Sequence, residues 1–192
     1  MTIKHDILVF LLTNLNIQQL NFEFLRYKIF PKDYSSSLYL ALQSDNILIR
    51  TKGAAGPSAG ASYDPSYDSF ELRPNFSISN WRDQGFFIHE STHAIVDMRN
   101  IGPHSGHEDE AVAYLAEAIF LESSKKSPLG NQSIRMISHN IAKGILSSRQ
   151  IKVSDADAKK LVSEVAQHPM YQSTALYNSN RFKRNLIHRL LR

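Results

Sequence analysis

The chain has 192 residues, 42% of them hydrophobic and 21% charged, a composition typical of a globular protein with enough chain for one domain and its core. It contains no cysteine. This excludes disulfide bonds and thiolate metal ligands, so any metal site must use histidine and carboxylate side chains. The formal net charge of +4 is only mildly basic, and we expect no nucleic-acid partner.

The first 45 residues are expected to be mainly helical. An apolar run over residues 7–12 is too short to span a membrane, and no small-residue cleavage site follows it, so it predicts a core helix rather than a signal segment. Apolar residues at helical spacing favour a second helix over residues 17–30, which Pro31 ends, and a short third helix over residues 35–43. We therefore expect a protein that is cytoplasmic, or secreted without a conventional signal peptide, and that has no membrane span.

Residues 46–74 predict a small antiparallel sheet. Residues 47–51 form one expected strand, and residues 61–64 and 69–73 form a hairpin around a turn that contains Pro65. The glycine-rich segment 53–60 lacks the Gly-Lys-Ser/Thr ending of a phosphate-binding loop, which argues against nucleotide binding. We expect a mobile loop there, and a lid near an active site is the functional hypothesis for it.

The sequence His-Glu-Ser-Thr-His at residues 89–93 is the most specific motif of the chain. Residues four apart lie on one face of a helix, so His89 and His93 can present two imidazoles to one metal ion. Glu90 lies beside them, where it can take a proton from a metal-activated water. This geometry is the reason that H-E-x-x-H patterns mark zinc hydrolases.

A catalytic zinc site needs a third protein ligand and one open position. Ser105 and Glu108 fit the Ser-x-x-Glu capping box of a second helix. If Glu108 is used at the cap, Glu110 becomes the better ligand. His104 and His107 are the alternatives, but the H-E-x-x-H-x-x-G-x-x-H pattern of a three-histidine site is absent, which favours the glutamate.

These residues resemble the gluzincins, the thermolysin-like zinc metallopeptidases. The match consists of residues 89–97, His-Glu-Ser-Thr-His-Ala-Ile-Val-Asp, and of Asp109-Glu110-Ala111, where the family carries H-E-x-T-H-A-x-x-D and Asn-Glu-Ala. Tyr114 stands where the family often has an aspartate that orients a ligand histidine. The resemblance implies one zinc ion per chain, with these roles: His89, His93 and Glu110 as ligands, Glu90 as general base and Asp97 as a supporting residue.

Two further kinds of residue complete the expected site. A tetrahedral oxyanion needs a hydrogen-bond donor besides the metal, and the candidates are Tyr114, Tyr171, His139 and His168. The predicted catalytic residues are thus Glu90, Tyr114 and Tyr171. Ligand imidazoles usually donate their second N–H to a carboxylate, a role that Asp97 and Asp109 could fill.

The remaining sequence predicts helices. The helix that carries the motif should be capped by Ser79 or Asn80. Further helices are expected over residues 132–146 and from a Ser154 cap to about residue 167. Basic and apolar residues interleave over residues 181–192, which favours an amphipathic packing helix over a membrane-surface or nucleic-acid contact.

The expected architecture is one α+β, mainly helical, zincin-like domain of residues 1–192 with a small sheet before the motif helix. Its parts are a helical segment 1–45, the sheet 46–74, the metal-site helices 79–124 and the C-terminal helices 130–192. The expected function is zinc-dependent hydrolysis of a protein or peptide substrate, with residues 69–73 as an edge strand that pairs with the substrate backbone. A bacterial toxin or effector of this kind would imply an inhibitor or immunity protein as partner. The alternative function is that of a non-catalytic, zinc-binding helical protein with a binding or regulatory role.

Overall fold

The computed structural model describes residues 2–51, 60–101, 105–130 and 132–172, and this part of the chain is α+β and mainly helical, as predicted. The α-helices are α1 (Ile3–Thr13), α2 (Tyr39–Gln43), α3 (Trp81–Met98), α4 (Gly106–Ser123), α5 (Ser133–Ser148) and α6 (Asp155–Gln167). The shorter 3-10 and π helices are η1 (Leu15–Gln19), η2 (Asp33–Leu38) and η3 (Pro169–Tyr171). The strands are β1 (Phe22–Phe24), β2 (Tyr27–Ile29), β3 (Leu48–Thr51), β4 (Ala61–Asp64) and β5 (Ser69–Leu72).

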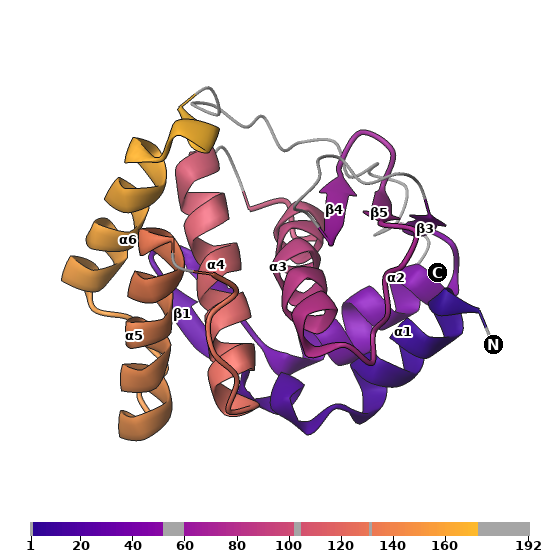
Figure 1. The fold of residues 1–192 in the computed structure, drawn as a ribbon, viewed down its shortest axis with the longest axis horizontal. Helices are drawn as coiled ribbons and strands as arrows, with labels where there is room; N and C mark the ends of the chain where they lie inside the picture. Colours follow the sequence, from indigo (N-terminus) through magenta and orange to yellow (C-terminus); the bar gives the residue numbers. More distant parts are fainter. Residues whose placement is uncertain (1, 52–59, 102–104, 131, 173–192) are drawn as a thin grey trace.

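Helices α3 and α4 lie against each other at the centre of the molecule (Figure 1). Helices α5 and α6 pack on α4, whereas β4 packs on α3 (Figure 1). Helix α4 is buried along most of its length, and its alanines Ala111, Ala113 and Ala116 are fully buried. Small side chains permit a close approach of neighbouring helices, so α4 can bring its polar residues directly against α3.

The helix predicted over residues 17–30 is wrong. The chain there forms η1 and then an antiparallel hairpin of β1 and β2, with Leu25 in the left-handed turn conformation at φ 51°. Burial alternates along both strands, whose inward-facing residues are Phe22, Phe24, Tyr27 and Ile29. This period of two is that of a strand with one buried face, and it is more regular than the helical spacing that the prediction used.

The three-stranded sheet has the order β3-β5-β4, and this corrects the prediction in two ways. The sheet is mixed rather than antiparallel, because β3 pairs in parallel with β5 while β4 pairs antiparallel with it. In addition, β5 is the central strand, and the edge strand beside α3 is β4. The sequence predicts the hairpin of β4 and β5 because a turn joins the two strands. No such turn joins β3 to β5, so their parallel pairing could not be predicted from local sequence.

The other helices follow the sequence pattern. Thr2 caps α1, whose apolar side chains pack into the core, and η2 with α2 covers the predicted helix at residues 35–43. Ser154 caps α6, and α5 covers the predicted residues 132–146 within a residue or two. Residues 52–59 and the helix predicted after residue 180 lie outside the described residues. Within the described chain, every helix is too short or too polar to cross a membrane.

Candidate metal centre

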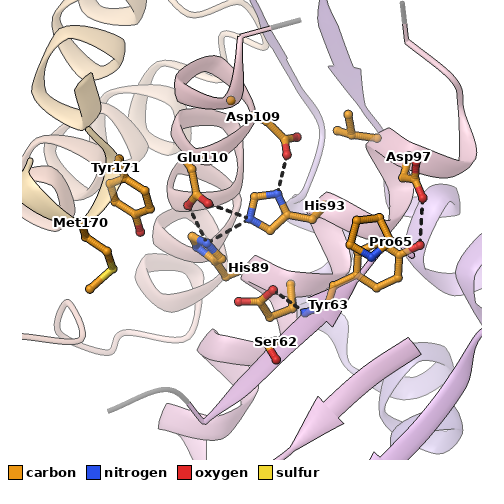
Figure 2. A pocket seen from close by; sticks show the side chains of 13 residues that line it. Ser62, Tyr63, Pro65, His89, His93, Asp97, Asp109, Glu110, Met170 and Tyr171 are labelled. Atoms are coloured by element: carbon orange, nitrogen blue, oxygen red, sulfur yellow. Dashed lines mark hydrogen bonds and ion pairs between the residues drawn. The ribbon is translucent and has the colours of Figure 1, made fainter. Parts of the chain in front are cut away.

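Helix α3 begins at a side-chain cap that fixes its first residue. The Asn80 side chain accepts a hydrogen bond from the Arg82 N–H at 2.9 Å, so Asn80 rather than Ser79 is the cap. One face of α3 enters the core with Phe87, Ile88 and Ile95. From the motif, His89 and His93 contact carboxylates of α4 (Figure 2), and Glu90 contacts β4.

Helix α4 begins at Ser105, whose hydroxyl accepts a hydrogen bond from the His107 N–H at 3.2 Å. The cap is therefore the predicted one. The Glu108 carboxylate, however, forms an ion pair with Arg26 at 2.8 Å. Glu110, two residues further along, turns toward α3 and the two motif histidines (Figure 2).

The three expected ligand side chains converge. The Nε2 atoms of His89 and His93 are 3.3 Å apart, and oxygens of Glu110 lie 3.4 Å from the first and 3.8 Å from the second. In a tetrahedral zinc site with bonds of about 2.0–2.1 Å, ligand atoms are about 3.3 Å apart. The spacing and the nitrogen and oxygen donors therefore fit a zinc ion, and these residues form the group of the described chain that could hold a metal.

Of the two alternative third ligands, the structure describes His107, and it is not part of this cluster. His107 contacts the main-chain carbonyl of Tyr171 through its Nε2 atom at 3.0 Å. His104 lies outside the described residues.

A carboxylate of α4 lies behind each of the two candidate ligand imidazoles. The Nδ1 atom of His93 contacts Asp109 at 2.8 Å, and the Nδ1 atom of His89 is 3.4 Å from Glu117. Glu117 is in turn held by the partly buried guanidinium of Arg135 from α5 at 2.9 Å. Such contacts fix the orientation of a ligand ring and its tautomer, so both imidazoles are presented with Nε2 toward the same point.

Sequence reasoning named Asp109 for this role but missed Glu117. The sequence did contain a pattern that points to Glu117. This residue is seven positions, or about two helical turns, after Glu110 and so lies on the same face of α4. Asp97, the other carboxylate expected to contact an imidazole, instead accepts a hydrogen bond from the Tyr63 hydroxyl at 3.0 Å.

The carboxylates dominate the electrostatics of the cluster. Burial opposes a charge on His89, but contacts with Glu110 and Glu117 outweigh it and raise its pKa to about 10. For His93, burial is likewise outweighed by Asp109 and Glu110, and the pKa rises to about 9. Burial would raise the pKa of Glu110, yet the two imidazoles lower it to about 2. The site thus stabilises positive charge between these side chains, which is what a bound dication requires.

Glu90 faces the same space from the next position of α3. Its Oε2 atom accepts a hydrogen bond from the Tyr63 main-chain N–H at 2.8 Å (Figure 2). Burial raises the pKa of this carboxyl, and the positive charges of His89 and His93 oppose that rise. A carboxyl with a raised pKa and a fixed orientation is suited to exchange a proton with a bound water.

A cavity of about 270 Å³ opens over this cluster. Helix α3 and the start of α4 supply its acidic and imidazole groups, β4 and the turn after it supply one wall, and η3 supplies another (Figure 2). The lining residues outside the metal cluster are Ser62, Tyr63, Pro65, Val96, Asp97, Gly106, Met170 and Tyr171. The open side of the cluster is therefore accessible to a ligand.

The four candidate oxyanion donors lie in different places. Tyr171 lines the cavity, and its hydroxyl hydrogen bonds to Glu110 and, at 2.6 Å, to the Tyr114 hydroxyl. Tyr114 lies behind it, with its ring edge-on to His89 at 4.6 Å between centroids. The other two candidates are engaged elsewhere: His139 pairs with Glu122 at 2.7 Å, and His168 caps η3.

No family model, curated protein or solved structure matches the chain. The resemblance to gluzincins therefore depends on the motif residues named above. What the fold adds is their placement, with four carboxylates and two imidazoles gathered at the junction of α3 and α4.

Proposed function

We propose that the protein is a zinc-dependent metallopeptidase. One observation carries the proposal: the Nε2 atoms of His89 and His93 and the carboxylate of Glu110 converge beside Glu90 on the floor of an open cavity. When bound by three protein ligands, zinc lowers the pKa of a water in its open position toward about 7 and polarises a carbonyl group. The donor set of this chain is suited to one such ion.

Glu90 is the proposed general base. Its carboxylate takes a proton from the attacking water and delivers that proton to the leaving amine, so that one peptide bond and one water give a carboxylate and an amine. The hydrogen bond from the Tyr63 N–H leaves the second carboxylate oxygen of Glu90 for this proton transfer. Tyr171 is the proposed donor to the oxyanion because it lines the cavity, and the hydrogen bond with Tyr114 orients its hydroxyl.

The proposed substrate is an extended segment of a protein or peptide. It would lie along β4, the edge strand whose residues Ser62 and Tyr63 border the cavity, and would pair with main-chain groups other than the Tyr63 N–H, which Glu90 holds. Main-chain pairing to an edge strand accepts many sequences, because the substrate contributes its backbone rather than particular side chains. This assigns to β4 the role that the sequence pattern had suggested for residues 69–73.

The test is to replace Glu90 with Gln and to compare cleavage of a peptide library, analysed by mass spectrometry, at equal zinc content. Glutamine keeps the size of the side chain but cannot take the proton, so cleavage should fall about 10²–10⁴-fold while zinc stays bound. Glu164→Gln on α6, outside the residues that line the cavity, is the matched control and should cleave as the wild type does.

Two results would argue against the proposal. Equal cleavage by wild type and E90Q would exclude Glu90 as the base. A wild-type protein that binds zinc and cleaves no peptide would favour the non-catalytic zinc-binding function instead.

A further inference from the structure

Helix α3 presents a row of three carboxylates to the sheet. Asp83, Glu90 and Asp97 are seven residues apart, which is about two helical turns, so they lie on one face of the helix. Asp83 binds the Arg73 guanidinium at 2.6 Å, Glu90 binds the Tyr63 N–H at 2.8 Å, and Asp97 binds the Tyr63 hydroxyl at 3.0 Å. The middle carboxylate is the proposed base, and the outer two attach the β4–β5 hairpin to the helix.

The N–H of Tyr63 is free of the sheet's own pairing. The Arg73 N–H donates to the Gly60 carbonyl, so Gly60 and Arg73 form a hydrogen-bonded pair. Hydrogen-bonded pairs alternate with non-hydrogen-bonded ones along an antiparallel ladder, so the next hydrogen-bonded pairs between β4 and β5 are Ser62 with Glu71 and Asp64 with Ser69. Tyr63 lies between these pairs, and its main-chain groups therefore point away from β5. That direction leads to Glu90, which agrees with the 2.8 Å hydrogen bond.

The side chain of Tyr63 holds this strand position in place. Its ring packs against Phe70 at 5.4 Å between centroids, and Phe70 packs against Phe87 of α3 at 5.1 Å. Its hydroxyl reaches Asp97, which is only 4% exposed. A hydrogen bond to a buried carboxylate is stronger than a neutral one, because the charge would otherwise lose its solvation. Tyr63 is thus attached to α3 at two carboxylates two turns apart.

We propose that Tyr63 is a positioning residue for the base. Its N–H fixes the rotamer of Glu90 relative to the metal ligands, and the bond between its hydroxyl and Asp97 keeps β4 in the register that places this N–H. The inference rests on the proposed peptidase function for its consequence in catalysis. The contact between Tyr63 and Glu90 can also be tested without any enzymatic activity.

The first experiment measures hydrogen exchange of the main-chain amide at position 63 by NMR on zinc-loaded protein. Tyr63→Phe removes the hydroxyl but keeps the ring, and E90A removes the acceptor; both should speed exchange at this amide about fivefold or more, the factor for one hydrogen bond of about 1 kcal/mol. E90Q keeps an acceptor oxygen and should leave exchange near the wild-type rate. Tyr67→Phe, at an exposed tyrosine in the turn after β4, is the matched control and should change nothing.

The second experiment is a double-mutant cycle on peptide cleavage with Y63F and D97A. Both variants should keep zinc and lower kcat about tenfold with little change in KM, because the proposed ligands and the main chain of β4 remain while the base loses its orientation. The double variant should be no worse than either single one, because both remove the same bond. Asp97→Asn retains an acceptor and should recover most of the kcat that D97A loses.

The outcomes separate the two proposals. Unchanged exchange at position 63 in Y63F and E90A, or additive losses of kcat, would overturn the role of Tyr63 and leave the peptidase intact. Altered exchange in a zinc-loaded protein that cleaves nothing would support the contact and reject the peptidase function.

Discussion

Each proposed ligand histidine is oriented by a carboxylate one residue before or seven residues after Glu110, the third proposed ligand. Asp109 contacts His93, and Glu117 contacts His89. The charge of Glu117 is balanced by Arg135, whose guanidinium also lies over the Tyr114 ring at 5.1 Å. The proposed ligand set is therefore supported from three helices, and its geometry depends on residues outside the His89, His93 and Glu110 cluster.

Replacing Glu117 with Ala should weaken zinc binding about 10–100-fold, because His89 loses the carboxylate that fixes its ring. Competition with a chromophoric chelator measures this directly. Glu122→Ala is the control on the same helix, since Glu122 pairs with His139 away from the cavity. Equal weakening in the two variants would mean that Glu117 has no specific role at the site.

At the residue scale, the part of the site that obeys helical spacing could be predicted from the sequence. His89 and His93 share a face by geometry alone, and Glu110 was named by its position relative to the cap at Ser105. Tyr63 could not be found in this way. Its contact with Glu90 depends on which edge of the hairpin meets α3, and a local pattern contains no information about that edge.

At the scale of elements, the distance between α3 and α4 decides whether the ligands meet. Ala113 is fully buried on the face of α4 that also carries Glu110 and Glu117. A methyl group at this point lets the two helices approach until the carboxylates reach the imidazoles. The helix contact and the proposed metal site therefore depend on the same small side chain.

Replacing Ala113 with Leu should lower the free energy of unfolding by about 1–3 kcal/mol, because extra methylenes in a packed interface force the helices apart. Zinc affinity should fall in the same variant, since Glu110 moves away from His89. Thermal unfolding and zinc titration measure the two effects. Ala156→Leu, at an exposed position of α6, should leave both nearly unchanged.

The elements that were misjudged share a physical cause. Over residues 22–29 the apolar positions satisfy both a helical and an alternating pattern, and the hairpin forms because each strand buries one face in the core. Glu23 also pairs with the segment beside Lys152, a partner far along the chain. The order β3-β5-β4 likewise depends on long-range pairing, which periodicity does not reveal.

At the scale of the whole molecule, a mildly basic chain of net charge +4 places a local excess of carboxylates at its centre. The two motif imidazoles have pKa values of about 10 and about 9 in the metal-free protein because these carboxylates favour their protonated forms. A metal ion requires neutral imidazoles, so it must displace these protons. The pH dependence of metal binding follows from this competition.

Zinc affinity should rise with pH through the neutral range and level off near the imidazole pKa values of about 9 and about 10. The sign follows because protons bound to His89 and His93 compete with the metal at lower pH. Calorimetric titration in buffers of different ionisation enthalpy should detect release of about two protons per zinc near neutral pH. Affinity that is independent of pH over this range would contradict the assigned ligands.

The most direct test of the central claim is the metal content of the protein, measured by inductively coupled plasma mass spectrometry after purification without a metal-affinity tag. We predict about one zinc ion per chain, the number that a single three-ligand site holds, and its loss in His89→Ala and in His93→Ala. A well-folded protein that holds no zinc even after zinc is supplied, or that keeps it in both variants, would contradict the assignment.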